Sequence, residues 1–546
     1  MTSRTIVSVF EENARKFSDR PFLRWRDAAL NEHLLTLGEF AGHVNRTGNV
    51  LKSAGVRKGE RLGIILPNRP ETVFFFAAGL KIGAVANPTN PKIRGEGLSF
   101  ILNNSEERVV ATDREHIGVI AALESELPHL ETIISVDGTP GETVALKSGR
   151  RVKALDYQRL FPEAAPELPP ERLDEKDGCS LIYSSGTTGK NPKGALVNHG
   201  NYLWDVEAMI EAGELTNEDA GYCFLPLFHV FGLVSAVSTP IVTGGSTRVT
   251  DFMTEILVHK LLFKTIEKDR VTSFGAVPTM LKFITDSYDP PSEDISSLRF
   301  IFSGGGPLPY DVYREFKKKF GVEVLQGWGQ SEGVCGYTVN PVKGPNKPHS
   351  IGKPFPGIEL AIMPYVSEDG SHVRLHKNEQ GYYTGEIVAV RAPVMDGYIN
   401  NPEGTKEVFD EEGRLRTGDI GYMDEDGYFY IVDRKKDMVV RGGENHYTGP
   451  IEDGIIESGL AYMAAVYGLE NPTYGQIIAA SVVPMPGADK KTLAERIREY
   501  CKNNGLFPPD LVIVESSLPI NDVGKVLKRQ LRQAHLAKGV EFAPKE

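Results

Sequence analysis

Apolar and polar positions alternate in the first part of the chain with two different spacings. Residues 39–54 and 71–82 have the pattern of helices that bury one face, whereas residues 61–66 and 108–112 are short apolar runs typical of strands. Helices and strands that follow each other in turn are typical of layered folds with a mostly parallel sheet. The pattern therefore predicts an α/β fold.

The same alternation returns in the middle of the chain. Residues 271–277 and 298–303 predict strands, and residues 279–286 and 309–320 predict helices. Between the two regions, residues 161–177 (FPEAAPELPPERLDEKD) are rich in proline and glutamate. This composition predicts a surface linker.

The last third of the chain differs from the rest. Residues 352–430 predict short strands joined by glycine turns, which indicates a smaller β-rich part. From about residue 436 to the end, a predicted helix (492–503) and a predicted strand (511–515) indicate a separate α+β unit.

Composition places the chain among ordinary globular proteins. It has 546 residues, of which 40% are hydrophobic and 25% are charged, and its net charge of −12 disfavours a general binder of nucleic acid or of anionic membranes. The four cysteines show no metal-binding spacing and suit a reducing compartment. No signal peptide is evident, and no apolar run approaches the ~18 residues of a membrane span. These features predict a cytoplasmic protein without an integral membrane span.

One loop predicts phosphate chemistry. Residues 181–194 (LIYSSGTTGKNPKG) begin as an apolar strand and continue as a loop of small, hydroxylated and basic residues. Such a loop lets backbone N–H groups, hydroxyls and lysines surround a polyphosphate. It is neither a Walker loop nor a Rossmann fingerprint, and by itself it could also be a flexible polar loop. Its candidate binding residues are Ser184, Ser185, Gly186, Thr187, Thr188, Gly189 and Lys193.

Seven further motifs follow this loop in a fixed order. They are LPLFHVFG (225–232), SGGGPLP (303–309), GWGQSEG (327–333), TGEI (384–387), RTGDIG (416–421), DRKKDMVVRGGEN (433–445) and LPINDVGKVLKR (518–529). In these motifs and their order, the chain resembles the adenylate-forming superfamily of acyl-CoA synthetases, luciferases and peptide-synthetase adenylation domains.

The resemblance implies a domain organisation. Residues 1–435 would form a large N-terminal domain of two layered α/β subdomains plus a small β-barrel-like subdomain, which binds ATP and the acyl substrate. Residues 436–546 would form a small, mobile α+β domain that carries the catalytic lysine. The hinge between them would lie at Lys436.

The resemblance also implies an ATP site. Glu332 would bind Mg²⁺ together with Thr187, since hard cations prefer oxygen ligands, and Ser331 would contact a phosphate. Asp419 would accept hydrogen bonds from the ribose hydroxyls, and Arg434 would lie near the ribose and phosphate. The remaining nucleotide-binding candidates come from the two glycine-rich motifs: Gly304, Gly305, Gly306, Gly327, Trp328 and Gly329.

Lys525 is the main predicted catalytic residue, with Glu332 and His229 as the other two candidates. The matching lysine of the family bridges the acyl carboxylate and the α-phosphate, where a positive charge offsets repulsion between two anions. Basic residues after it (Lys528, Arg529 and Arg532) are expected on a helix facing water. After rotation of the C-terminal domain, a strand with Gly442, Gly443 and Glu444 would form the channel for coenzyme A.

The predicted acyl pocket is apolar. It would contain Phe231, Val277, Val334 and Cys335, with His229 at its border as a gate. Amino-acid-activating relatives commonly have an aspartate near this position, whereas this chain reads His-Val-Phe-Gly (229–232). An apolar fatty or aryl acid is therefore the expected substrate.

The chain departs from the family pattern in three places. One residue is inserted at positions 190–191 of the phosphate loop, Trp328 replaces the more usual tyrosine, and residues 444–453 (ENHYTGPIED) match poorly beside the expected thiol channel. The leading hypothesis is an AMP-forming acyl-CoA synthetase that uses ATP, Mg²⁺ and coenzyme A. An acyl-AMP ligase that loads a separate carrier protein, and a nucleotide or acyl-ligand sensor without activity, are the alternatives. The oligomeric state stays open, with a homodimer among the alternatives.

Overall fold

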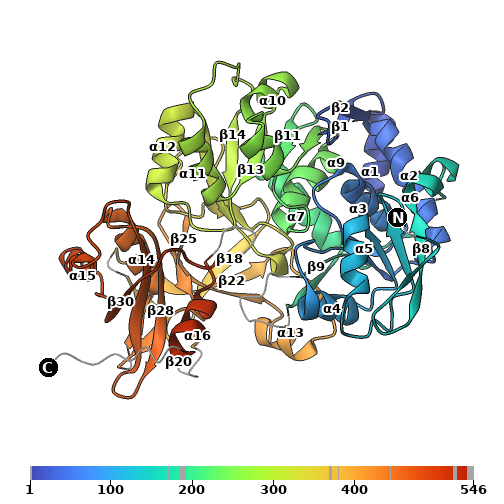
Figure 1. Cartoon of the computed structure of the whole chain (residues 1–546). Coiled ribbons are helices and arrows are strands. Elements are labelled where there is room, and N and C mark those ends of the chain that lie inside the picture. Colours follow the sequence, from blue (N-terminus) through green and yellow to red (C-terminus); the bar gives the residue numbers. More distant parts are fainter. Residues whose placement is uncertain are drawn as a thin grey trace. The chain divides into compact units, whose positions relative to one another are not determined.

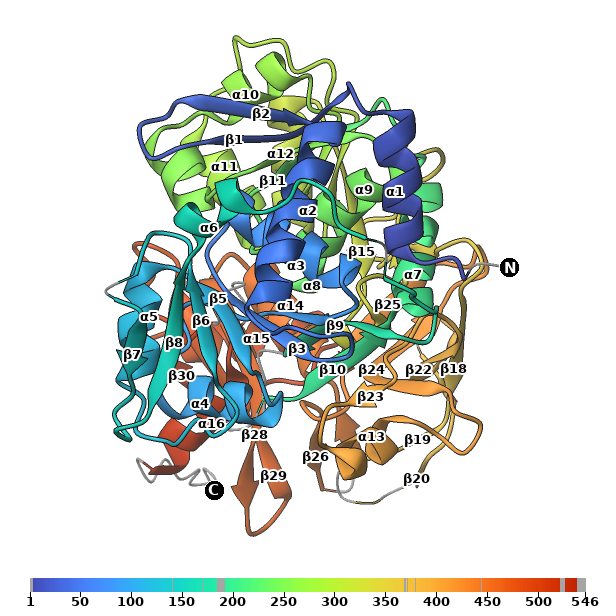
Figure 2. The same cartoon turned by 90° about the vertical axis from the view of Figure 1, so that its right-hand side faces the viewer.

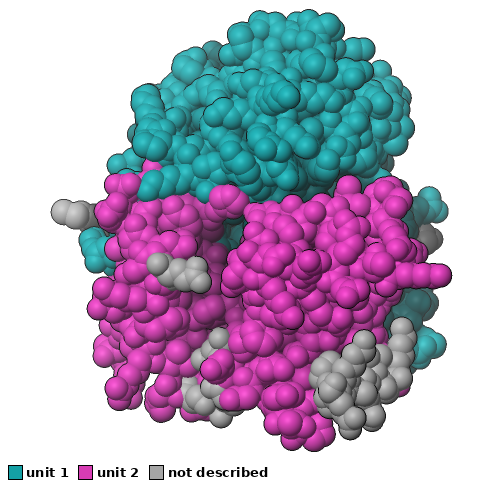
Figure 3. All heavy atoms as spheres, turned by 90° about the vertical axis from the view of Figure 1, so that its left-hand side faces the viewer, with its two compact units in different colours: residues 1–348, 352–359, 391–407 teal, residues 349–351, 360–390, 408–546 magenta. Residues whose placement is uncertain are grey.

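The fold is known from a computed structural model of the chain (Figure 1). It describes residues 3–139, 141–169, 171–183, 192–367, 370, 372–378, 380–442, 444–520 and 526–537. The chain divides into two compact units, coloured separately in Figure 3. Unit 1 comprises residues 1–348, 352–359 and 391–407, and unit 2 comprises residues 349–351, 360–390 and 408–546.

Unit 1 contains two nine-stranded sheets. The first is parallel from β15 to β1, with antiparallel strands added at both edges. Its strands, in order across the sheet, are β17 (Lys353–Pro354), β16 (Thr338–Val339), β15 (Glu323–Trp328), β14 (Phe300–Ser303), β13 (Ser273–Ala276), β11 (Ala220–Cys223), β12 (Ser246–Val249), β1 (Pro21–Arg26) and β2 (Glu32–Thr36).

The second sheet of unit 1 is parallel from β9 to β8 and again has antiparallel edges. In order across the sheet its strands are β23 (Gly397–Tyr398), β10 (Gly194–Asn198), β9 (Gly178–Tyr183), β4 (Val85–Pro88), β3 (Arg61–Ile65), β5 (Val109–Thr112), β6 (Thr132–Ser135), β8 (Arg151–Asp156) and β7 (Thr143–Ala145).

Helices occupy the space between the two sheets. Helix α3 (Pro70–Lys81) packs on β3 and β4 of the second sheet, and α2 (Leu37–Ser53) packs on α3 and on β1 and β2 of the first, as Figure 2 shows. Helix α7 (His199–Gly213) packs on β9 and β10 and on the short helices that follow β11. Every residue of α3 from Thr72 to Lys81 is buried, because both of its sides are covered.

The outer face of each sheet has its own core. Helices α10 (Leu262–Asp269), α11 (Pro278–Ser287) and α12 (Tyr310–Phe320) bury apolar side chains against β13 and β14, while α4 (Gly95–Asn104) and α5 (Arg114–Ala121) do so against β5 and β6. The layered α/β fold predicted from the sequence is confirmed. Each of the eight helices and strands predicted in the first two regions forms within one or two residues of its expected position.

Unit 2 combines the β-rich part with the end of the chain. Strands β22 (Tyr383–Arg391), β24 (Leu415–Met423) and β25 (Phe429–Arg434) pair in an antiparallel sheet. A second sheet has the order β27 (Glu444–His446), β26 (Val439–Arg441), β29 (Gly475–Pro484) and β28 (Ala461–Asn471), with β30 (Leu511–Val514) parallel to β29. Helices α14 (Thr448–Glu457) and α15 (Leu493–Asn503) cover one face of it, and α16 (Lys528–Ala537) covers the other. The domain boundary proposed at residues 435 and 436 stays a prediction.

The surface linker expected at residues 161–177 begins inside α6 (Tyr157–Glu163) and stays within unit 1, and most of its described residues are exposed. Asn45 and Asn49 of α2 donate hydrogen bonds to the carbonyls of Pro166 and Glu167. The carbonyls of an extended segment need such partners, and α2 supplies them. Lys528 does not face water, because it lies in an ion cluster with Glu452. Within the described ranges, every helix is too short or too polar to cross a membrane.

Candidate functional site

Four loops that carry predicted residues follow the carboxyl ends of adjacent strands in the first sheet. His229 and Phe231 come after β11, Val277 after β13, residues 304–306 after β14, and Glu332 after β15. These strands are neighbours in the order β15, β14, β13, β11 and run parallel. Loops at the carboxyl edge of a parallel sheet lie side by side, which is where α/β enzymes bind ligands.

Glu332 is anchored at two points. The hydroxyl of Tyr398 donates to its Oε1 at 2.7 Å, and the backbone N–H of Met395 donates to its carbonyl at 2.8 Å. Burial, together with the Glu332 carboxylate, raises the pKa of Tyr398, so its phenol stays a donor. The Lys193 ammonium lies 4.9 Å from the centre of the Tyr398 ring. Tyr398 thus connects two predicted site residues, although no motif in the sequence pointed to it.

The loop around Glu332 leaves no room for side chains at its glycines. A Cβ at Gly327 would lie 2.7 Å from the Thr338 carbonyl oxygen, and one at Gly329 would lie 1.9 Å from that of Cys335. Trp328 lies between these glycines, buried, with its ring centre 5.2 Å from that of Tyr337. Ser331 begins the short helix η3 (Ser331–Gly333) that places Glu332.

Two of the predicted acyl residues pack against neighbouring glycine backbones. The Phe231 ring lies against two of them: a Cβ at Gly275 would be 3.0 Å from this ring, and one at Gly304 would be 3.3 Å away. Val277 lies against the left-handed Gly305, at 3.3 Å from its ideal Cβ. Phe231 and Val277 are thus close to the same glycine-rich segment after β14, and Val334 and Cys335 are both buried in the loop after β15.

His229 acts as a helix cap in this structure. Its Nδ1 accepts a hydrogen bond from the Phe231 N–H at 3.2 Å, at the start of α8 (Val230–Leu233). Burial lowers the pKa of His229 to about 4, so the imidazole is neutral at pH 7. Because the ring is neutral and its Nδ1 accepts a hydrogen bond, His229 does not donate protons from both nitrogens. This state suits the predicted position at the border of the acyl pocket.

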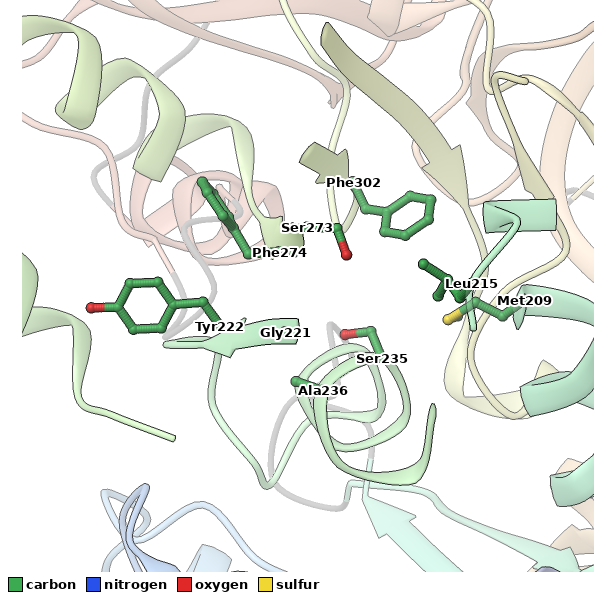
Figure 4. Close-up of a pocket in the computed structure, with 10 residues that line it drawn as sticks. Met209, Leu215, Gly221, Tyr222, Ser235, Ala236, Ser273, Phe274 and Phe302 are labelled. Carbon is green, nitrogen blue, oxygen red and sulfur yellow. The ribbon is translucent and has the colours of Figure 1, made fainter. Parts of the chain in front are cut away.

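A small cavity of about 20 Å³ lies beside Gly275, the glycine against which the Phe231 ring packs (Figure 4). Gly275, Phe274 and Phe302 come to it from the sheet, and Met209 from α7. The hydroxyls of Ser235 and Ser273 point toward each other across it, whereas the hydroxyl of Tyr222 points away and donates to Glu255. The space is enough for one water molecule or one small group.

Unit 2 brings three of the predicted motifs together. Asp419 of β24 pairs in register with Arg434 of β25, and the Arg434 Nε lies 2.7 Å from its Oδ1. The fully buried Glu386 of β22 accepts from Arg416 at 2.9 Å and from the Gly418 N–H at 3.1 Å. The motifs TGEI, RTGDIG and DRKKD therefore share one antiparallel sheet.

The region after the predicted hinge contains an ion cluster that the sequence did not reveal. Asp433, the first residue of the hinge motif, accepts hydrogen bonds from the Thr448 N–H and hydroxyl, and the Lys528 ammonium donates to the Thr448 hydroxyl at 2.8 Å. Lys528 also pairs with Glu452 at 2.7 Å. Thr448 lies inside the stretch 444–453 that departs from the family pattern, so part of this departure serves the cluster.

The predicted coenzyme A channel residues lie on the hairpin of β26 and β27. Gly442 has a φ of +60°, which suits glycine, and Glu444 is exposed. Arg441, beside them, pairs with both carboxylate oxygens of Asp510 at 2.9 and 3.0 Å. Lys436 lies in unit 2 directly after β25. Residues 184–189, Gly443 and the predicted catalytic Lys525 lie outside the described residues.

Comparison with known proteins gives consistent matches over nearly the whole chain. Two family models match, the AMP-binding enzyme over residues 10–399 and the AMP-binding enzyme C-terminal domain over residues 451–525. The chain is 29% identical to the long-chain-fatty-acid–CoA ligase of Bacillus subtilis (strain 168), over 97% of this chain and 94% of that protein. It is 31% identical to a feruloyl-CoA synthase of Amycolatopsis sp, over 91% and 94%. The solved structure of the anthranilate CoA ligase AuaEII with anthranoyl-AMP superposes with a TM-score of 0.85 at 25% identity, over 99% of both chains.

Proposed function

The chain belongs to the AMP-binding enzyme family, and from this membership we propose that it activates an apolar carboxylic acid with ATP and transfers it to coenzyme A. The chain is an enzyme of the acid–thiol ligase type, as its relatives are. In the first proposed step, a carboxylate oxygen attacks the α-phosphorus of ATP and the bond to pyrophosphate breaks. In the second, the thiolate of coenzyme A attacks the acyl carbon and AMP leaves.

The anchored carboxylate of Glu332 is the observation that carries the proposal. Mg²⁺ commonly uses one or two carboxylates together with oxygens of the substrate phosphates. A single glutamate whose position is set by Tyr398 and by the Met395 N–H fits such a shared site. Bound Mg²⁺ would neutralise phosphate charge, and Glu332 would hold it.

Asp419 and Arg434 support nucleotide binding in unit 2. Their ion pair at 2.7 Å holds the buried Asp419 carboxylate in place on the sheet. A carboxylate that accepts hydrogen bonds from ribose hydroxyls needs such a fixed position. Residues 184–189 would bind the phosphates through N–H groups and hydroxyls. Lys525 would stabilise the charge that develops as the acid attacks phosphorus.

The substrate is proposed to be an apolar fatty or aryl acid. The predicted pocket residues Phe231, Val277, Val334 and Cys335 are all apolar, so they would offer no charged partner to a substrate tail. Apolar pockets favour apolar ligands. The Phe231 ring closes the space over Gly275 and Gly304. This closure favours flat or short tails in the observed side-chain arrangement.

An acyl-AMP ligase that loads a separate carrier protein is the second candidate. The unusual stretch 444–453 favours it, because this stretch lies beside the expected thiol channel. The contacts of Thr448 with Asp433 and Lys528 give part of that stretch a structural role and weaken this alternative. A sensor without catalysis is the third candidate. The cytoplasm is the proposed location, since four free, buried cysteines suit a reducing compartment.

A substrate panel tests the proposal. The full chain is incubated with ATP, Mg²⁺ and fatty, aryl and amino acids, with and without coenzyme A, and pyrophosphate, AMP and thioester are measured. Thioester and AMP that appear only with coenzyme A would support the leading proposal. Pyrophosphate without coenzyme-A-dependent release of AMP would favour the carrier-protein alternative, and no turnover on the panel would favour a sensor.

A further inference from the structure

The loop that carries Glu332 contains a backbone conformation that valine rarely adopts. Val334 has φ +67° and ψ −65°, and the Cys335 N–H donates to the Gly333 carbonyl at 2.7 Å. These values define a γ-turn of the positive-φ form, which is rare and strained. A β-branched residue with positive φ is a true outlier, at a cost of about 1–3 kcal/mol. The turn persists only where its surroundings hold it.

Three contacts hold the two ends of this turn. On its amino-terminal side, the Met395 N–H donates to the Glu332 carbonyl at 2.8 Å. On its carboxyl-terminal side, the Gly336 N–H donates to Oδ1 of Asp205 at 3.2 Å. At the neck of the loop, the Tyr337 N–H donates to the Trp328 carbonyl at 2.8 Å.

Asp205 is unusual among these anchors. It comes from α7, 131 residues earlier in the chain, and its side chain is fully buried. Within the described part of the chain its Oδ2 has no hydrogen-bond partner. Burial raises the pKa of Asp205 well above its usual range. A buried carboxyl with a single partner is unfavourable for stability by itself, which points to a role at that partner.

We infer that Asp205 is a positioning residue that locks the strained turn at Val334 through the Gly336 N–H, and thereby sets the position of Glu332. This inference rests on the proposed role of Glu332 in binding Mg²⁺ with ATP. Without the Asp205 contact, the turn relaxes toward negative φ and shifts Glu332, which lies two residues before Val334. The expected consequence is weaker use of Mg·ATP, with little change in the affinity for the acid.

Substitutions at Asp205 and Val334 test the inference together. Asp205→Leu removes the acceptor, and we expect the KM for Mg·ATP to rise about tenfold, equivalent to ~1.4 kcal/mol. Asp205→Asn keeps an acceptor in place and is the matched control, expected to stay within about twofold of the wild type. Glycine adopts positive φ without strain, so adding Val334→Gly to Asp205→Leu is expected to restore most of the loss. Val334→Ala removes side-chain volume but keeps the strain, and is expected not to restore it.

The same variants separate this role from general stability. A merely structural Asp205 would lower the melting temperature without changing KM below that temperature, and that result would overturn the inference. An equal effect of glycine and alanine at Val334 would overturn it as well. So would a changed acid preference in Asp205→Leu with an unchanged KM for Mg·ATP, because Asp205 would then contact the substrate.

A second comparison remains informative if Asp205→Leu does not fold. In the otherwise natural chain, Val334→Gly is expected to unfold at a higher temperature than Val334→Ala, because only glycine relieves the strain. An alanine variant at least as stable as the glycine variant would contradict a strained, clamped turn. Failure of the proposed function is distinguishable, since the natural chain would then release no pyrophosphate with any acid. Thermal shifts with Mg·ATP report on the same site without turnover.

Discussion

Two regions of the molecule place ionisable side chains away from water, one in each unit. In unit 1, helix α7 carries the buried Asp205 and His199, and burial raises the pKa of the first and lowers the pKa of the second to about 4. In unit 2, the contact of β25, α14 and α16 keeps Lys528 beside Glu452 and Asp433. Burial by itself lowers the pKa of Lys528, but these carboxylates outweigh it and raise the pKa.

The difference shows two ways to position a functional group. Buried groups with few hydrogen bonds, such as those on α7, hold one geometry through packing and depend little on salt. Paired charges hold a contact strongly, yet each depends on its partner, because a charge left alone in a partly buried place is costly. We therefore expect the first region to fail through packing and backbone conformation, and the second through loss of charge balance.

The largest expected effect concerns a single charge in the C-terminal region. Lys525→Ala removes the proposed stabilising charge, and we expect acyl-AMP formation to fall about a thousandfold, ~4 kcal/mol. Thioester formation from supplied acyl-AMP is expected to continue, since the lysine acts in the first half-reaction. Arg529→Ala, at an exposed position of α16, is the control for loss of a nearby positive charge. Equal loss of both half-reactions would rule out this assignment.

Breaking the ion cluster is expected to have the next largest effect. Lys528→Met leaves Glu452 and Asp433 without their cation and is expected to lower the free energy of unfolding by about 3 kcal/mol. Adding Glu452→Gln should recover part of this loss. On the same helix, Arg532 forms an exposed pair with Glu470, so Arg532→Ala should cost less than about 1 kcal/mol. Chemical denaturation of the three variants measures these differences, and equal losses at both sites would contradict the comparison.

The burial of His199 on α7 predicts that the stability of unit 1 depends on pH. The folded-state pKa of His199 is about 4 and the ordinary value is 6.5, so between these values the unfolded chain binds a proton that the folded chain does not. Stability from this group is thus complete above pH 6.5 and is lost as the pH falls toward 4, by about 2 kcal/mol at pH 5.

His199→Phe removes this titration. Unfolding measured from pH 8 to pH 5 should be about 2 kcal/mol less pH-dependent in the variant than in the natural chain. The same substitution at exposed His372 controls for the loss of one histidine. An unchanged pH dependence in His199→Phe would show that the buried imidazole is not neutral as described.

The smallest expected effect is on substrate choice. Phe231→Ala opens the space over Gly275 and Gly304, and we expect kcat/KM for longer tails to rise about tenfold relative to short acids, ~1.4 kcal/mol. Phe224→Ala removes the same ring from the outer core and should not change this ratio. A preference that does not change would place the acyl tail elsewhere.

Local sequence patterns predicted much of the fold. The expected helices at 71–82 and 309–320 form as α3 and α12, and the expected strand at 298–303 forms as β14. These segments have a clear apolar pattern and the tertiary structure agrees with it. The composition of the stretch 161–177 indicated a surface segment, which its exposure supports, but not its hydrogen bonds with α2.

The site could be predicted where a motif names the residue. Glu332, Asp419 and Phe231 belong to such motifs, and parallel strand order places Glu332 and Phe231 at one sheet edge. Tyr398 and Asp205 could not be predicted in this way. Their functions depend on which distant backbone group or carboxylate they meet, and neither sits in a motif.

By itself, the sequence determined the layered α/β fold, the order of the motifs and the family, because these depend on local periodicity and on short runs of residues. Only the tertiary structure decided that Tyr398 holds Glu332, that Asp205 faces the strained turn at Val334, and that Lys528 is paired rather than exposed. The physical reason is distance along the chain. Hydrogen bonds and ion pairs act over about 3 Å in space, whereas these partners are separated by 66, 131 and 76 residues in sequence.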